Sequence, residues 1–251
     1  MILSPFNPIF FLRGRKAYGL DSPYVQTFSR FDRILVEVIR TDEEASPSVV
    51  LVDAETGEDV REIAGESFDI GNGEVVDCYA LSRQREGYYF LAIGDDDSET
   101  FRVTGNAECL KDTVLIEYSA SGNKLRRDVV GEADGERIYF SFRVPGGFKD
   151  NGWNFSIDNE QFVTQLSDIV ELYGRESCQQ TLTVGHGDGV PIWFGDLLNR
   201  LLTCRYVYID GKRYARFESS VPEKEQTIDG VNSFVFTQKL QRINHMEPTK
   251  E

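Results

Sequence analysis

The sequence predicts a mainly β fold: two β-sandwich-like domains, the second with one short amphipathic helix packed on a sheet. Short apolar runs recur along the chain with turn-forming residues between them, which is typical of antiparallel sheets. Aromatic residues make up 12% of the chain, with 17 Phe and 11 Tyr, and such side chains pack well on pleated surfaces. Helical periodicity of useful length occurs in one place, residues 191–203.

Residues 1–110 are predicted to form an N-terminal β-sandwich or jelly-roll-like domain. In "EVVDCYALSR" both alternating faces are largely apolar, as in a strand buried inside a sandwich. "AETGED" predicts a hairpin turn with Gly57 at its tight point. Further strands are expected at the apolar runs "ILVEVIR" (34–40), "SVVLVD" (48–53), "YYFLAIG" (88–94) and "TFRVTG" (100–105).

Residues 111–243 are predicted to form the second domain, and residues 244–251 a flexible tail. Asp210-Gly211 is a strong hairpin signal, because a type I′ turn needs positive φ at both central positions. Strands are expected at "TVLIEYS" (113–119), "RIYFSFRV" (137–144), "WNFSI" (153–157), "IVELYG" (169–174), "CQQTLTVG" (178–185) and "FVFTQKL" (234–240), with "PGGFKDNG" as a loop.

The helix predicted over residues 191–203 opens with Pro191, which suits a first helical turn because its missing N–H is not needed there. Trp193, Leu197 and Leu201 recur at i, i+4 and i+8. This spacing produces one apolar stripe, which we expect to cover a sheet.

The charge of the chain is −15, divided as −11 over residues 1–110 and −4 over residues 111–251. Such a chain repels phosphate backbones and anionic lipid, so we expect no nucleic acid and no membrane as partners. The basic run of Arg13, Arg15 and Lys16 has two interpretations. It is either a solvated strand end or a possible interface, in which it docks against an acidic neighbour.

The opening "MILSPFNPIFFLRGRK" does not have the order of a signal peptide, because its charges follow the apolar part and two prolines interrupt it. It suits either an arm laid across an adjacent subunit or the first strand of its own domain. No apolar run reaches the 18 residues that indicate a membrane span.

The loop "GHGDG" precedes the helix, as a phosphate-binding loop would, yet it lacks the Lys and Ser/Thr of GxxxxGK[ST]. We therefore interpret it as a strand-to-helix turn. His186 beside Asp188 could form half of a general-base pair. No GxSxG motif accompanies it, so a surface-loop histidine is the favoured interpretation.

Other candidate sites are equally sparse. "GDDDSE" (94–99) lacks the spacing of a calcium loop, and we interpret it as a solvated loop, with Ca²⁺ binding left open. The four cysteines are scattered without CxxC spacing, which predicts reduced, buried thiols and no zinc site, although a pair between Cys78 and Cys109 stays open. Trp153, beside Gly152 in a loop, is the one candidate glycan contact. We expect no cofactor, no metal, no catalytic residue and no enzymatic activity.

The C-terminal half resembles uncharacterised proteins of tailed phages and prophages of Bacteroidales. The strand ending "LTVG", the helix "GVPIWFGDLLNRLLTC", the hairpin "VYIDGKRYAR" and the late "PEKE…FVFTQKL" carry this likeness over roughly residues 137–243. Such proteins look like tail or baseplate components, similar to distal tail or minor tail proteins.

The resemblance implies a virion structural protein that assembles in a ring through contacts with copies of itself and with other tail or baseplate proteins. It implies localisation in the virion tail, and in the host cytoplasm during assembly. The alternative that the residues leave open is a carbohydrate-binding or adhesive β-sandwich module.

Overall fold

The computed structural model of the chain is 54% strand and 7% helix, which confirms the mainly β prediction. It is organised as several sheets with β-sandwich-like packing and few helices. The structure describes residues 1–12, 22–123, 128–133, 135–150, 152–218, 220–227 and 230–243.

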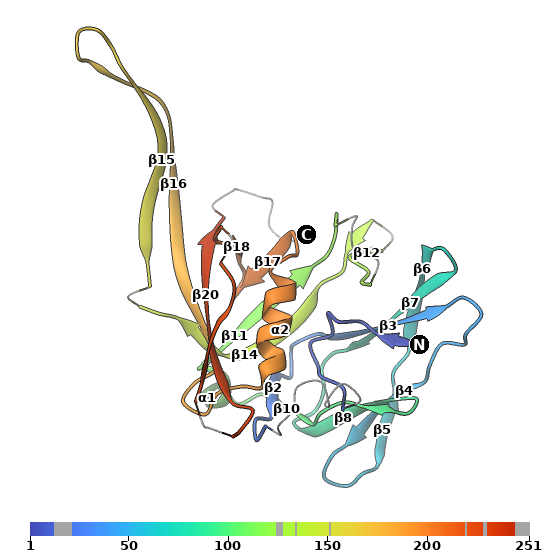
Figure 1. Ribbon diagram of the computed structural model, residues 1–251. Coiled ribbons are helices and arrows are strands. Elements are labelled where there is room, and N and C mark those ends of the chain that lie inside the picture. Colours follow the sequence, from blue (N-terminus) through green and yellow to red (C-terminus); the bar gives the residue numbers. More distant parts are fainter. Residues whose placement is uncertain are drawn as a thin grey trace.

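Two sheets are built from strands within residues 1–104 (Figure 1). The first has the order β1 (Ile2–Leu3), β3 (Ile34–Thr41), β7 (Glu74–Leu81) and β6 (Gly65–Gly71). The second has the order β2 (Gln26–Ser29), β10 (Phe101–Thr104), β8 (Gly87–Ile93), β4 (Val49–Asp53) and β5 (Asp59–Glu62), with β9 (Asp96–Asp97) paired to β8.

The side chains of β3 point alternately to two hydrophobic cores, one on each face of the strand. Val36 and Val38 pack with Leu51 and Leu91 in the core of the N-terminal sheets. Leu35, on the opposite face of the same strand, belongs to the core of the C-terminal sheet. A β-strand sends successive side chains to opposite faces, so β3 is buried on both sides.

The C-terminal strands pair in one closed circuit. The order runs β16 (Ile169–Val184), β14 (Phe140–Phe148), β11 (Thr113–Ser119), β17 (Tyr206–Ile209), β18 (Lys212–Arg216) and β20 (Phe234–Arg242), and β20 pairs back with β16. Outside this circuit lie β15 (Asn154–Val163), β19 (Glu223–Gln226), the small pair of β12 (Glu132–Ala133) and β13 (Glu136–Arg137), and the short helix α1 (Ala107–Leu110).

Helix α2 (Ile192–Leu201) packs its apolar stripe into the C-terminal core, as predicted, with Trp193, Leu197 and Leu201 buried. Pro191 is the N-cap residue and has an extended backbone, so it lies just before the first turn and not within it. The predicted helix end at 203 is two residues too long. The hairpin at Asp210-Gly211 is confirmed, because both residues have positive φ (46° and 74°).

The first residues of the chain pack against both the N-terminal and the C-terminal sheets of the same molecule. Ile2 and Leu3 pair antiparallel with Ile39 and Val38 of β3, and Phe6 is buried in the C-terminal core. Residues 1–12 therefore form a first strand and its following turn, while Arg13, Arg15 and Lys16 lie outside the described residues.

The structure corrects three predicted elements. The separate strands expected at 153–157, 169–174 and 178–185 are two long strands, β15 and β16, because β16 runs without interruption from Ile169 to Val184. β14 continues through part of the expected loop at 145–148, where Gly146 and Gly147 pair with β16. The acidic loop at 94–99 contains β9, which pairs with Ala92 and Ile93.

Candidate assembly surface

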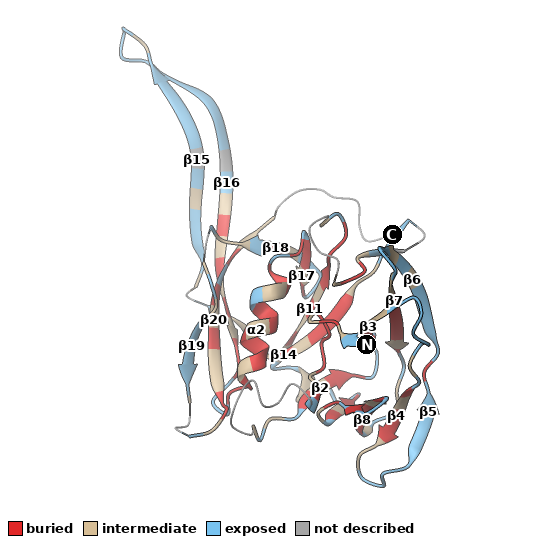
Figure 2. Ribbon diagram, turned by 45° about the vertical axis from the view of Figure 1, so that its right-hand side comes forward, coloured by how far each residue is buried: buried red, intermediate tan, exposed pale blue. Residues whose placement is uncertain are grey.

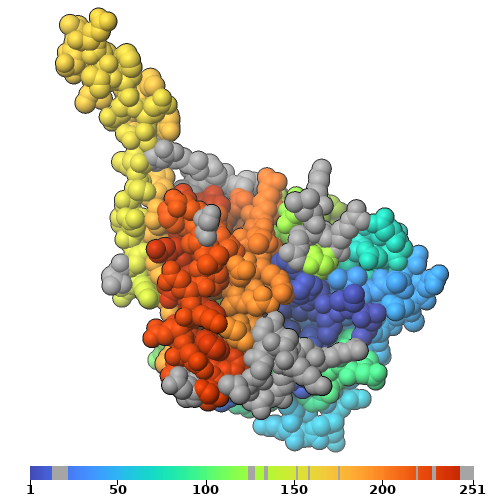
Figure 3. Space-filling model, in the orientation of Figure 1, coloured from blue at the N-terminus to red at the C-terminus, as the bar shows by residue number. Residues whose placement is uncertain are grey.

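The hairpin of β15 and β16 projects from the body of the protein (Figures 1 and 3). β16 is anchored at one end only, where residues Gln179–Val184 pair with β20. From residue 178 to the tip, β16 pairs with β15 alone. We call residues 154–178 the arm. The ten residues of β16 from Ile169 to Cys178 span roughly 30 Å at the usual rise of a strand.

Local contacts hold the tip of the arm. The amide of Thr164 donates to the carbonyl of Asp168 at 2.8 Å, and the amide of Ser167 donates to the carbonyl of Thr164 at 3.0 Å. Ser167 takes a positive φ of 65° to close the turn. A bulge at Glu160/Gln161 leaves one extra residue on β16, and such bulges bend and twist a ribbon.

Apolar side chains concentrate on this arm although little of the chain covers them. Figure 2 shows most of the arm as exposed, whereas β11 and β14 in the body contain no exposed residue. Leu166 at the tip is 85% exposed, and Phe155 near the base is 74% exposed. Ten of the eighteen exposed large apolar side chains in the described residues lie between 153 and 173: Trp153, Phe155, Ile157, Phe162, Val163, Leu166, Ile169, Val170, Leu172 and Tyr173.

Such a ribbon is unusual for a chain that works alone. A two-stranded hairpin by itself is marginally stable in water, and monomeric proteins rarely expose large contiguous apolar patches. Between Gln179 and the tip, the outer edges of β15 and β16 also present unpaired backbone groups. Such edges are templates for pairing with another chain. The arm therefore has the chemistry of a protein–protein interface.

Trp153, predicted as a glycan contact, lies at the base of the arm. It is 44% exposed and stacks on Phe155 with ring centroids 5.9 Å apart and an interplanar angle of 29°. The pair forms an exposed aromatic surface on the same element as the apolar side chains of the arm.

The "GHGDG" loop is a turn, as predicted. Gly185 and Gly189 have positive φ values of 92° and 69°. A Cβ on Gly189 would collide with the hydroxyl of Ser233, so only glycine fits there. The amide of Ile192, the first of α2, already donates to the side chain of Asn232 at 2.8 Å. His186 bonds through Nε2 to the carbonyl of Asp112 at 2.7 Å, which ties the loop to the start of β11.

The largest pKa shift of a carboxyl group belongs to a buried structural residue. Burial raises the pKa of Glu37 to about 8, partly offset by the amide of Val130 and the thiol of Cys78, which bond to it. The side chain is completely enclosed and lies where β3 meets the C-terminal core. All four cysteines are free thiols, and Cys109 is half-buried and not fully buried as predicted.

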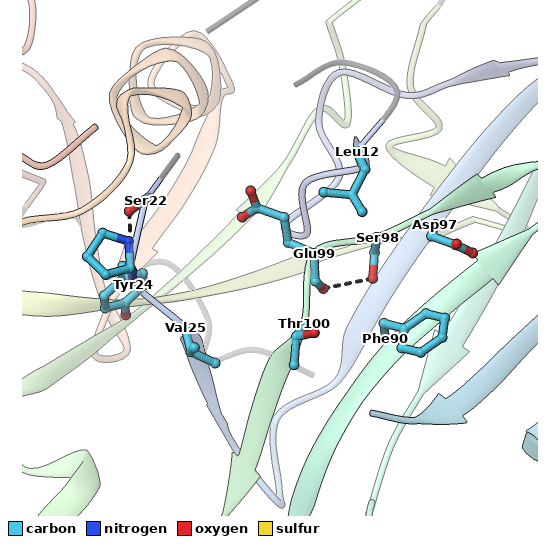
Figure 4. A pocket seen from close by; sticks show the side chains of 10 residues that line it. Leu12, Ser22, Tyr24, Val25, Phe90, Asp97, Ser98, Glu99 and Thr100 are labelled. Carbon is cyan, nitrogen blue, oxygen red and sulfur yellow. Dashed lines mark hydrogen bonds between the residues drawn. The ribbon is translucent and has the colours of Figure 1, made fainter. Parts of the chain in front are cut away.

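A pocket of about 360 Å³ lies beside the residues that precede β10 (Figure 4). Its described titratable lining groups are Tyr24, Asp97 and Glu99. The carboxyl groups of Asp97 and Glu99 extend to different sides of Ser98 and not toward each other. Ser98 itself is used structurally, because it accepts from the amide of Leu91 at 2.9 Å and donates to the carbonyl of Glu99.

Within the described residues, no group of three or more His, Cys, Asp or Glu side chains has the arrangement of a metal site. Among the helices of the same residues, none is long and apolar enough to cross a membrane.

No family model matches the chain, and no curated protein matches it. A solved structure, the crystal structure of a Zn-binding triple mutant of the GH family 9 endoglucanase J30, aligns at 18% identity with a TM-score of 0.24. The alignment covers 50% of this chain and 27% of the endoglucanase chain. This chain thus spans about a quarter of that structure, and a likeness of this size carries no argument about function.

Sequence reasoning missed the arm. The signal was present, since "FVTQLSDIV" carries a turn between two apolar runs that alternate with polar residues. Taken locally, the two runs predict short strands of a sandwich, in which their apolar side chains are covered.

Proposed function

We propose that this chain is a structural subunit of a phage tail or baseplate ring, which assembles through contacts with copies of itself and with neighbouring tail proteins. The arm is the observation that carries the proposal. Its exposed apolar side chains and free strand edges are suited to burial against another subunit.

The energetics favour such burial. Removing one large apolar side chain from water contributes about 1.5–3 kcal/mol. Association costs about 4–15 kcal/mol in lost freedom of motion. Five such side chains together contribute more free energy than the lower end of that cost. They are Phe162, Leu166 and Ile169 around the tip, and Phe155 and Ile157 nearer the base.

The phage lineage rests on the resemblance of residues 137–243, which include the arm, α2 and the β17–β18 hairpin. A virion subunit made in the host cytoplasm and carried in the tail is consistent with an acidic, thiol-containing chain whose interactions are with other proteins. Other tail proteins would bind the faces that the ring leaves open.

The test is the size of the purified full-length chain in solution, measured by mass photometry and sedimentation velocity. The wild type is expected to form a closed oligomer of one defined size. Leu166→Ser combined with Ile169→Ser is expected to leave monomers, because it removes apolar surface that only assembly buries. Val60→Ser, at an exposed position on β5, is the matched control and should still assemble. A wild type that stays monomeric at high concentration would overturn the proposal.

A carbohydrate-binding role is the second candidate, favoured by the exposed stack of Trp153 on Phe155. A glycan array probed with wild type and with Trp153→Ala separates the two functions. Binding that disappears in Trp153→Ala while the oligomer persists would assign the aromatic pair to a sugar. Absence of binding by the wild type would exclude this role.

A further inference from the structure

Five arginines gather at one end of the N-terminal domain, in the half of the chain that carries a net charge of −11. They come from the β2–β3 turn, the β7–β8 loop and β10. We call this surface the arginine end. Its members are Arg30, Arg33, Arg83, Arg85 and Arg102, all exposed except Arg102, which is partly buried.

Strand pairing brings these residues together. The amide of Arg30 donates to the carbonyl of Thr104, the last residue of β10, at 3.0 Å. Arg33 directly precedes Ile34, which pairs with Leu81 at the start of the β7–β8 loop. The other end of that loop, Gly87, pairs with Val103 of β10. The turn, the loop and the strand end therefore lie side by side.

The arginines of this surface form no salt bridge with the described residues. Asp32, the acid within the β2–β3 turn, is already paired with Arg143. Glu86 is the remaining acid of the β7–β8 loop, and it lies close to the stem of Arg30. Glu66 and Glu136 line the same pocket as Arg33, so the surface carries five arginines against these two acids and Glu86.

An aromatic side chain lies among these charges. Phe31 is 78% exposed, and the guanidinium of Arg30 lies 5.3 Å from the centre of its ring. Arg102 similarly covers the ring of Tyr88 at 5.8 Å. Arginine and aromatic residues are the types most enriched where protein interfaces concentrate their binding energy.

The arm is complementary to this surface. Residues 154–178 contain five acids, Asp158, Glu160, Asp168, Glu171 and Glu176, against the single base Arg175. In the sequence of the arm, acidic residues are thus interspersed with apolar ones. Pairing two arms edge to edge would bring like charges together, which disfavours an arm-to-arm dimer.

The two surfaces of one molecule do not meet. Figure 1 and Figure 2 both show the arm extending away from the end where β2 lies. A contact between them must therefore join two copies. A contact between different surfaces of identical subunits is heterologous, and it generates a ring when the rotation closes.

We propose that the arginine end receives the arm of a second copy of this chain, with the acidic side chains of the arm against the arginines and its apolar tip against Phe31. This inference rests on the proposed function, since it names the two surfaces that would join subunits. Long-range attraction between them would also orient the subunits before contact.

Charge reversal tests the contact. Arg30→Glu with Arg85→Glu is expected to raise the apparent dissociation constant of the oligomer at least tenfold, and Glu160→Lys with Glu171→Lys should do the same. Mixing the two reversed chains should restore association, because each then presents the charge that the other lacks. Arg61→Glu on β5 and Glu225→Lys on β19, both exposed, are the matched controls and should leave assembly unchanged. All variants are checked for folding by circular dichroism and thermal unfolding.

A covalent test locates the contact independently. Chains carrying Leu166→Cys are mixed with chains carrying Phe31→Cys, each with Cys109→Ser to remove the half-buried thiol. A mixed disulfide between the two chains, absent when Val60→Cys replaces Phe31→Cys, is the expected result.

Each other outcome has a distinct meaning. If the apolar tip variants dissociate but the arginine variants assemble normally, the proposed function stands and the arginine end is not the receiver. If the wild type never assembles, both fail. If a short DNA duplex binds the wild type, and the arginine variants lose only that binding, the surface serves a nucleic acid and this inference is overturned.

Discussion

A carboxylate oxygen of Glu37 accepts a hydrogen bond of 3.1 Å from the backbone amide of Val130, 93 residues further along the chain. The other carboxylate oxygen lies 3.5 Å from the thiol of Cys78. The carboxyl group thus ties β3 to a segment of the C-terminal core. It does so from a position without contact with water, where a charge is costly.

The stability of the protein should therefore decrease as pH rises from 4.5 to about 8. Burial, and to a smaller extent the charge of Asp128, raises the pKa of Glu37 from an ordinary 4.5 to about 8. Between these two pH values the folded chain keeps a proton on Glu37 that the unfolded chain releases. The free energy of unfolding that Glu37 contributes is therefore fully present below pH 4.5. As the pH rises above 4.5, this free energy of unfolding falls by about 1.4 kcal/mol per pH unit, and it levels off above the pKa of Glu37 in the folded chain.

Urea unfolding at a series of pH values measures this slope. Glu37→Gln should flatten it, whereas Glu58→Gln, at an exposed site, should not. An unchanged slope in Glu37→Gln would show that other groups cause the pH dependence.

The ion pair of Asp32 and Arg143 should stabilise the contact between the β2–β3 turn and β14. The guanidinium of Arg143 donates to the two carboxylate oxygens of Asp32 at 2.6 and 2.9 Å, and both side chains are largely buried. Arg143→Met should lower the free energy of unfolding by about 3–5 kcal/mol, because it leaves a buried charge without its partner.

Denaturant unfolding of Arg143→Met, Asp32→Asn and the double variant completes a thermodynamic cycle. The double variant should cost less than the sum of the single ones. Strict additivity would show that the two charges do not stabilise each other.

Gly195→Ala should destabilise the protein, although alanine is the better helix former. A Cβ at position 195 would lie 2.2 Å from the ring of Phe236, so α2 would have to move away from β20. We expect a loss of about 1–3 kcal/mol, measured as the shift of the urea midpoint. Gly147→Ala on β14, where nothing lies within 4 Å of the added carbon, is the control. An equal effect of both substitutions would contradict the close packing.

The amides of the arm should exchange with solvent much faster than those of the anchored end of β16. Residues 179–184 pair with β20 and lie over a buried core, whereas residues 154–163 pair with β16 alone. In a monomeric tip variant we expect exchange on the order of a hundredfold faster in the arm. Hydrogen exchange with mass spectrometry measures both segments in one experiment. Equal protection in the monomer would mean that the arm is stable without a partner.

Several elements could be predicted from local sequence. The strand at residues 34–41 follows from its run of apolar residues, and α2 follows from the spacing of Trp193, Leu197 and Leu201. The turn at Asp210-Gly211 follows from the need for positive φ. Each of these signals depends on neighbours a few residues away, so the chain displays it directly.

The arm was predicted only as separate strands, because alternation reports that a residue is in a strand and does not report which side is covered. The arginine end escaped prediction for a similar reason. Arg30 and Arg85 are far apart in sequence, and the net charge of the N-terminal half is strongly negative. Only the pairing of β2, β8 and β10 collects the positive charges in one place.

The sequence by itself determined that this protein is mainly β, where most of its strands lie, and that helix α2 covers a sheet with its apolar stripe, since periodicity and turn chemistry are local properties. The tertiary structure alone decided which strands close the C-terminal circuit, that β15 and β16 extend beyond it, and that Glu37 is enclosed between two cores. These features depend on contacts between residues distant in sequence, whose free energies are not written in any short stretch of the chain.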